Sequence, residues 1–264
     1  LADTKFIALF GMLFGGGAAI MIKRWVQAGR QPLFPYYRRM VVLAGLGWLH
    51  GFYFWDGDIL FYYGVYGCLI FPLALLPGHW LFVLGIAGIF GNGFIHGWPY
   101  IPHHAGYGYV EMQILTGDWA QQLEWRREET QRTYEIVVKQ FALQGIGFMA
   151  IGMALVKGGI ITGHRRPWSY LFMAFAGFVI GIPMIGFLTD WCKDFDEYRG
   201  AMFELGSLFV TFGWMGSAVA LSCYAPNFFF TRGLANVGRL ALTNYLSHTL
   251  ICTYIFYGHG LGQF

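Results

Sequence analysis

Residues 38–58 read RRMVVLAGLGWLHGFYFWDGD, an apolar run with two arginines at one end and two aspartates at the other. One histidine, His50, interrupts the apolar part. On a helix that rises about 1.5 Å per residue, His50 lies roughly 16 Å beyond Arg39. An ionisable side chain at that depth in a membrane is costly and usually has a partner or a function. The stretch therefore predicts a membrane-spanning helix over residues 38–55, with His50 as its most informative residue.

The composition of the whole chain agrees with a membrane protein. Of its 264 residues, 56% are hydrophobic and only 12% are charged. So few charges cannot cover a water-soluble surface. Glycine pairs such as Gly11-x-x-x-Gly15 and Gly177-x-x-x-Gly181 suit close helix packing in lipid. The four cysteines show no CxxC spacing, so neither a metal centre nor a disulfide framework is indicated.

Apolar runs of roughly 17–25 residues are needed to cross a hydrocarbon core about 30 Å thick. We therefore expect an all-α, polytopic transmembrane helix bundle that forms a single domain over residues 1–264. The expected spans, about eight, are residues 4–22, 38–55, 59–76, 79–98, 136–156, 168–188, 201–224 and 237–257. Residues 99–135 interrupt the series. There Trp119, Leu123 and Trp125 indicate an amphipathic helix on the outer face or, equally, an ordinary solvated helix.

Basic and acidic residues lie in different loops of the expected bundle. Ten of the seventeen lysines and arginines fall within residues 23–39, 157–166 and 232–239, and none of the fourteen aspartates and glutamates does. The positive-inside rule then places these basic loops in the cytoplasm, and the acidic loops with residues 99–135 outside. Leu1 is not an initiator methionine, and the first apolar run is a poor signal peptide because it lacks a cationic start and a small-residue cleavage site. We therefore expect the chain to begin inside a longer protein.

Several polar side chains would lie within the expected spans. Asn92 and Glu204 fall near the outer ends of theirs, and Asn244 and His248, four residues apart, share one face of the last. A cavity that opens to the outer side, with His50 and His248 among its walls, would satisfy these groups together. Alternatively, each hydrogen-bonds a neighbouring helix, which contributes about 0.6 kcal/mol on average.

Residues 238–246 read GRLALTNYL, which resembles the GRxALTNYL signature of the YeiB-like family of bacterial integral membrane proteins, a family of unknown function. LFGMLFG at residues 9–15, GDIL at residues 57–60 and Gly-Leu-Gly at residues 260–262 resemble further family segments in the same order. The resemblance implies a multi-pass protein of the bacterial inner (cytoplasmic) membrane. Family members open with one or two further spans, including an arginine-containing helix, so we expect N-terminal spans to be missing from this chain.

The YeiB-like family is similar in turn to the transmembrane acyltransferases, which include the acyltransferase-3 proteins. In those proteins an Arg-x10-His arrangement serves the use of acyl-CoA, and Arg39 and His50 have this spacing. The resemblance implies that arginines bind the CoA phosphates and that His50 is a general base or an acyl carrier. The catalytic candidates are His50, Asp58 and His248. The candidates for binding a substrate or cofactor are Arg38, Arg39, Asn92, Glu204, Arg239, Asn244 and Tyr245, and no metal site is expected.

The leading hypothesis is transfer of an acyl group from cytoplasmic acyl-CoA to an outward-facing acceptor. Acyl-CoA would then be a co-substrate, and no bound cofactor is expected. A non-catalytic subunit of a larger membrane complex and a small-molecule transporter remain alternatives, so the sequence leaves open whether the chain is an enzyme. The absence of inverted repeats argues mildly against a transporter. The expected partners are membrane lipids and proteins of a membrane complex, without nucleic acid.

Overall fold

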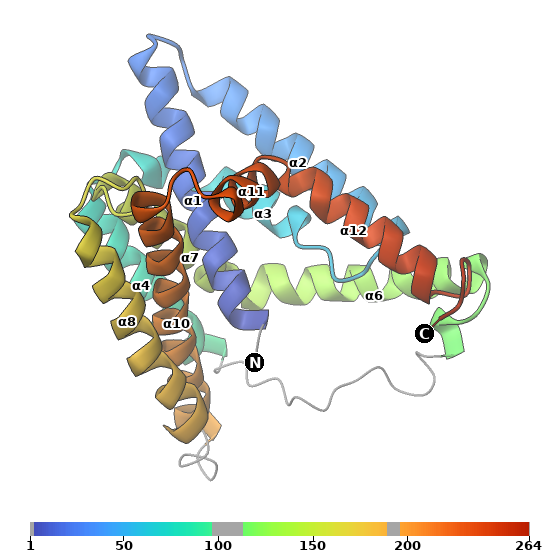
Figure 1. The fold of residues 1–264 in the computed structure, drawn as a ribbon. Coiled ribbons are helices and arrows are strands. Elements are labelled where there is room, and N and C mark those ends of the chain that lie inside the picture. The colour runs from blue at the N-terminus through green and yellow to red at the C-terminus, as the bar shows by residue number, and fades with distance from the viewer. Residues whose placement is uncertain (1–2, 97–112, 189–195, 264) are drawn as a thin grey trace. The chain divides into compact units, whose positions relative to one another are not determined.

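The computed structural model describes residues 3–96, 113–188 and 196–263, and all regular structure in these ranges is helical (Figure 1). The predicted all-α class is therefore confirmed. The helices are α1 (Asp3–Gln27), α2 (Leu33–Tyr53), α3 (Leu60–Ile70), α4 (Gly78–His96), α6 (Trp119–Gln140), α7 (Ala142–Lys157), α8 (Pro167–Pro183), α10 (Asp196–Tyr224), α11 (Phe229–Arg239) and α12 (Ala241–Phe256), with the short 3₁₀-helix η1 (Pro72–Leu75) and the short π-helix η2 (Met184–Leu188).

Fewer helices than the expected eight are long and apolar enough to cross a membrane. Within the described ranges four qualify, Phe6–Gln27, Gly78–His96, Pro167–Phe187 and Gly200–Tyr224, and a fifth is added if α6 and α7, bent by 64°, form one span. By their length and apolar composition, these helices identify the chain as a membrane protein. The expected span 38–55 corresponds to α2, which is unbroken but is not among the qualifying helices. Two further spans were expected in error because apolar runs do not show where a helix breaks. The run 59–76 breaks before Pro72, and the run 237–257 divides into α11 and α12.

The helices form two compact units. The first contains residues 1–36, 66–100 and 140–231, and the second contains residues 37–65, 101–139 and 232–264. In the first unit, α7 packs against α1 and α4, while α10 packs against α1 and α8. Its buried apolar core consists of Ala8, Met12, Ile89, Phe148, Ile151, Leu155, Leu208 and Met215.

Glycines allow the helices of the first unit to approach closely. A Cβ atom at Gly15 of α1 would collide with the carbonyl group of Met149 in α7. Gly177 and Gly181 of α8 likewise lie against the backbone of α10, and neither leaves room for a side chain. The small-residue contacts predicted at these three glycines are confirmed, and they are the packing that lipid favours.

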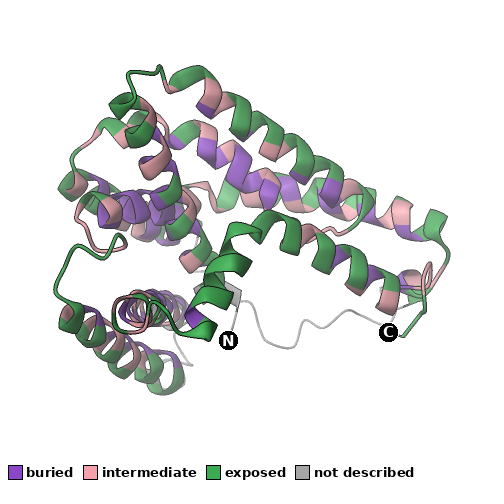
Figure 2. Ribbon diagram, turned by 45° about the horizontal axis from the view of Figure 1, so that its top comes forward, coloured by how far each residue is buried: buried purple, intermediate pink, exposed green. Residues whose placement is uncertain are grey.

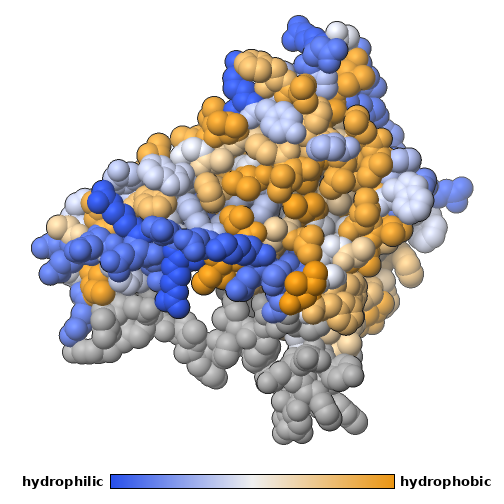
Figure 3. Space-filling model, turned by 180° about the vertical axis from the view of Figure 1, so that it is seen from behind, coloured by the Kyte–Doolittle hydropathy of each residue, from blue (hydrophilic) through white to orange (hydrophobic). Residues whose placement is uncertain are grey.

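The outward faces of the first unit are apolar. Exposed residues lie on the outer sides of the helices and buried residues between them (Figure 2), and a space-filling view shows large apolar areas on the surface (Figure 3). On α8, for example, Phe172 is 63% exposed and Phe175 is 67% exposed. Such faces suit contact with hydrocarbon, where an apolar side chain needs no partner.

In the second unit, α2 and α3 form a hairpin. A Cβ atom at Gly47 of α2 would collide with the backbone nitrogen of Phe61 in α3, and one at Gly64 would meet the backbone of α2. The two helices therefore approach within backbone contact. This packing brings the last turn of α2, which contains His50, beside Asp58 at the start of α3.

Candidate functional site

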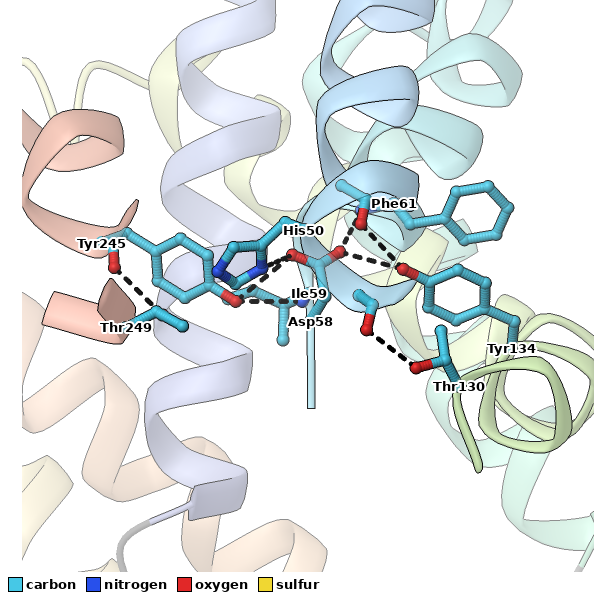
Figure 4. A network of polar contacts seen from close by, with 10 residues as sticks. His50, Asp58, Ile59, Phe61, Thr130, Tyr134, Tyr245 and Thr249 are labelled. Atoms are coloured by element: carbon cyan, nitrogen blue, oxygen red, sulfur yellow. Dashed lines mark hydrogen bonds and ion pairs between the residues drawn. The ribbon is translucent and has the colours of Figure 1, made fainter. Parts of the chain in front are cut away.

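A hydrogen-bonded histidine–aspartate pair lies in the second unit (Figure 4). Nδ1 of His50 is 2.8 Å from Oδ1 of Asp58, and the two residues are only 4% and 1% exposed. Nε2 of His50 is buried and has no hydrogen-bond partner among the described residues. Because the carboxylate accepts the Nδ1–H bond, the lone pair of the neutral imidazole lies on Nε2. The pair therefore presents an oriented base at Nε2.

Asp58 is held in place by the helix that it precedes. Its Oδ2 accepts a hydrogen bond from the Phe61 N–H at 2.8 Å. This is the N-cap interaction for which aspartate is favoured. The hydrogen bond to Phe61 uses Oδ2, and Oδ1 binds His50. The first turn of α3 therefore sets the orientation of the carboxylate.

Tyr245 of α12 adjoins the pair. Its hydroxyl accepts the Ile59 N–H at 3.3 Å and donates to Oδ1 of Asp58 at 3.4 Å. Its ring centroid lies 5.2 Å from that of His50 (Figure 4). Tyr245 thus contacts both members of the pair through one side chain.

A polar stripe of α6 contacts the same hairpin. Thr130 donates to the carbonyl group of Gly51, and Tyr134 donates to that of Gly47, each at 2.9 Å. The Tyr134 hydroxyl also lies 3.5 Å from Oδ2 of Asp58. α6 therefore binds the backbone of α2 on both sides of His50 in the sequence.

The face of α6 that is buried within the protein is polar. Its buried residues are Gln122, Arg126, Thr130 and Tyr134, whereas Trp119 of the expected apolar face is 39% exposed. Residues four apart share a helix face, so the polar spacing in Gln-x3-Arg-x3-Thr-x3-Tyr was a readable signal. Sequence reasoning missed it because it sought an apolar face.

The structure brings two of the three predicted catalytic residues together. His50 and Asp58 form the pair, while His248 is exposed on α12. Of the predicted binding residues, Tyr245 lies at the pair. Asn244 is exposed and donates to the carbonyl group of Val237 at 3.1 Å, so it joins α12 to α11.

The predicted arginines are exposed: Arg38 and Arg39 on α2, and Arg239 in the last turn of α11. At 3.6 residues per turn, Arg39 and His50 lie within about 20° of the same face of α2, whereas Arg38 is about 120° from His50.

Asn92 and Glu204 belong to the first unit. They are 2% and 4% exposed, and the Glu204 carboxyl group interacts with the Gln144 side chain of α7.

Replacing Tyr245 by phenylalanine should lower the free energy of unfolding by about 1 kcal/mol, because the Ile59 N–H and Asp58 each lose a hydrogen-bond partner. Thermal unfolding in detergent measures the change. Tyr254→Phe is the control, since the Tyr254 side chain lies on the same helix and is 58% exposed. Equal melting temperatures for the two variants would contradict the role of the Tyr245 hydroxyl.

These features define a helical membrane protein with a buried histidine–aspartate pair. Residues 155–264, which contain the GRLALTNYL segment, match a family described as "Protein of unknown function (DUF418)". Uncharacterized protein YeiB of Escherichia coli (strain K12) is 29% identical over 290 residues, which cover 99% of this chain and 71% of the relative. Uncharacterized protein YxaH of Bacillus subtilis (strain 168) is 27% identical over 287 residues, which cover 99% and 69%. No solved structure matches. The chain is therefore similar to YeiB-like proteins over nearly its whole length, in agreement with the resemblance of its sequence segments.

Proposed function

We propose that this protein transfers an acyl group from cytoplasmic acyl-CoA to a hydroxyl or amine group of an outward-facing acceptor in the bacterial inner membrane. The observation that carries the proposal is the unpartnered, buried Nε2 of His50, oriented by Asp58. A neutral imidazole held by a carboxylate is a general base of the kind that acyl transfer uses. In this proposal the basic loops are cytoplasmic and the acidic loops are outside.

The proposed reaction has two proton transfers. Nε2 of His50 takes the proton of the acceptor group while the acceptor atom attacks the thioester carbonyl. A bond to the acyl carbon forms, the carbon–sulfur bond breaks, and the leaving thiolate takes the proton from Nε2. The products are the acylated acceptor and CoA. Asp58 holds the ring and stabilises the imidazolium that forms between the two steps.

Arg39 is the residue proposed to receive the phosphates of CoA. It is exposed and lies on nearly the same face of α2 as His50. A guanidinium group pairs well with phosphate. The roughly 16 Å between the two residues along the helix suits the extended arm that joins the phosphates of CoA to its thioester.

The test is release of CoA by the purified protein in nanodiscs, supplied with acetyl-CoA or longer acyl-CoAs and with candidate acceptors. His50→Gln should lower the rate about 10²- to 10⁴-fold, the contribution of a general base. His79→Gln is the matched control, because His79 is an exposed residue of the first unit. An unchanged rate in His50→Gln would remove His50 from the reaction. Failure of the folded wild-type protein to release CoA would favour a non-catalytic subunit.

A further inference from the structure

Arg126 is the largest fully buried side chain of the described residues, and it lies two turns before Tyr134 on α6. Its Nη1 donates to the carbonyl group of Tyr53, the last residue of α2, at 2.8 Å. Nε and Nη2 are also buried, but neither has a hydrogen-bond partner in the part of the chain that the structure describes. A buried donor without a partner has lost its hydration without compensation, and this loss is larger for a charged donor than for a neutral one. The guanidinium group is therefore only partly satisfied.

The two unpartnered atoms define the ligand that would satisfy Arg126. The Nε–H bond and one Nη2–H bond of a guanidinium group are parallel and form one edge of the fork. Such an edge binds two oxygens of a single carboxylate or phosphate group. Since Nη1 is engaged by Tyr53, this edge is the part of Arg126 that remains for a ligand.

Aromatic rings border the guanidinium group. The centroids of Trp119 and Tyr257 lie 5.5 Å and 5.8 Å from Cζ of Arg126, which is cation–π distance. The His259 ring meets that of Trp119 edge-on, with centroids 4.9 Å apart. Trp119 and His259 are partly exposed, so they lie where a ligand would approach.

The hydrogen bonds of Gln122 assign the proton on His259. The amide nitrogen of Gln122 donates to the carbonyl groups of Leu115 and Gly117, so its Oε1 is an acceptor. Nδ1 of His259 lies 2.7 Å from that oxygen and therefore carries a proton. Nε2 of His259 becomes a second donor when the ring is protonated.

Arg126 is the charged group that acts on the His259 ring. Burial and the charge of Arg126 both lower the pKa of His259. Asp56 is a carboxylate that acts on Arg126 and offsets part of its charge. The other groups around the His259 ring, Gln122, Trp119 and Tyr257, are neutral at pH 7. An anion beside Arg126 would favour the protonated form of His259.

We propose that Arg126 and His259 form a binding site for an oxyanion, the phosphate or carboxylate group of a lipid or of a soluble molecule. Arg126 supplies two parallel N–H bonds, and protonated His259 supplies a third from Nε2. The segment after α12 holds His259 in place, because the Gly258 N–H bonds to the Leu115 carbonyl group at 2.9 Å. This site uses no member of the His50–Asp58 pair and does not depend on acyl transfer.

The test is an NMR titration of the protein with labelled histidines in phosphatidylcholine nanodiscs, with the His259 signal assigned by its loss in His259→Gln. Inorganic phosphate and acetate are added at constant ionic strength. We expect a saturable shift of the His259 signal, a raised pKa of His259, and tighter binding as the pH falls through that pKa. If the ligand is a lipid phosphate, nanodiscs with phosphatidic acid should show the raised pKa without added phosphate. If none of the probes gives a saturable shift of the His259 signal, the proposal is wrong.

Arg126→Gln should abolish saturable binding, and Arg127→Gln is the charge-matched control. Arg127 is the exposed neighbour on α6, and its Cζ lies 5.8 Å from the Tyr53 ring. Equal loss in both variants, or binding retained in Arg126→Gln, would show only general attraction of anions and would refute the site.

His259→Gln provides a second test if Arg126→Gln does not fold, because it leaves the Arg126–Tyr53 bond in place. Isothermal titration should show binding weakened about tenfold, the value of one charge-assisted hydrogen bond, and binding should no longer tighten as the pH falls from 7 to 5. Unchanged affinity in His259→Gln would also refute the site.

Discussion

Replacing Asp58 by asparagine should leave the protein folded and lower the rate of acyl transfer about 10⁴-fold, the loss known for such a change in a histidine–aspartate pair. The Phe61 N–H requires an acceptor at the Oδ2 position. The asparagine oxygen therefore takes that position, and its NH₂ group faces Nδ1 of His50. Nδ1 must then accept, the proton moves to Nε2, and the base is lost. Helix capping is retained, because asparagine caps as well as aspartate.

Two measurements on the same preparation separate catalysis from capping. CoA release reports the loss of the base at Nε2, and thermal unfolding reports whether the cap of α3 is retained. Asp118→Asn is the matched control. Asp118 is exposed and caps α6 in the same manner, with its Oδ1 accepting the Gln121 N–H at 2.9 Å, but it has no histidine at its second oxygen among the described contacts. Its substitution should change neither rate nor stability. Activity retained in Asp58→Asn would show that the carboxylate does no more than cap α3.

Replacing Gly47 by alanine should destabilise the second unit by about 3 kcal/mol, the upper part of the range for overpacking. The added methyl group would collide with the backbone nitrogen of Phe61. Backbone yields less readily than a side chain, so α2 and α3 would have to separate. The separation would also part His50 from Asp58, and we expect CoA release to fall with the melting temperature.

Gly45→Ala, two residues earlier on α2, is the control for this change. No atom lies within 4 Å of its added methyl group, so it should gain up to about 1 kcal/mol from the better helix propensity of alanine. Unfolding in detergent should place the two variants on opposite sides of the wild-type melting temperature. A Gly47→Ala protein as stable as wild type would show that the hairpin is not held by this contact.

The parts of this protein that sequence reasoning predicted correctly are those set by composition and by local chemistry. The low share of charged residues, 12%, indicated a membrane protein, and the long apolar helices agree with it. His50 was singled out because an ionisable group within an apolar run is costly and usually has a partner or a function. The capping role of Asp58 was not predicted, although aspartate in a turn before a helix is typical of a cap. The glycine pair of α8 predicted a close helix contact, which α10 provides.

What depended on the tertiary structure is which helix faces meet. The 3.6-residue period groups Gln122, Arg126, Thr130 and Tyr134 on one face, but only the packing of the second unit shows that this face meets α2. The same packing turns Tyr245 towards His50 and leaves His248 exposed. Periodicity relates residues within one helix. The angle at which a helix meets its neighbour depends on contacts between residues far apart in the chain, and no local pattern contains that information.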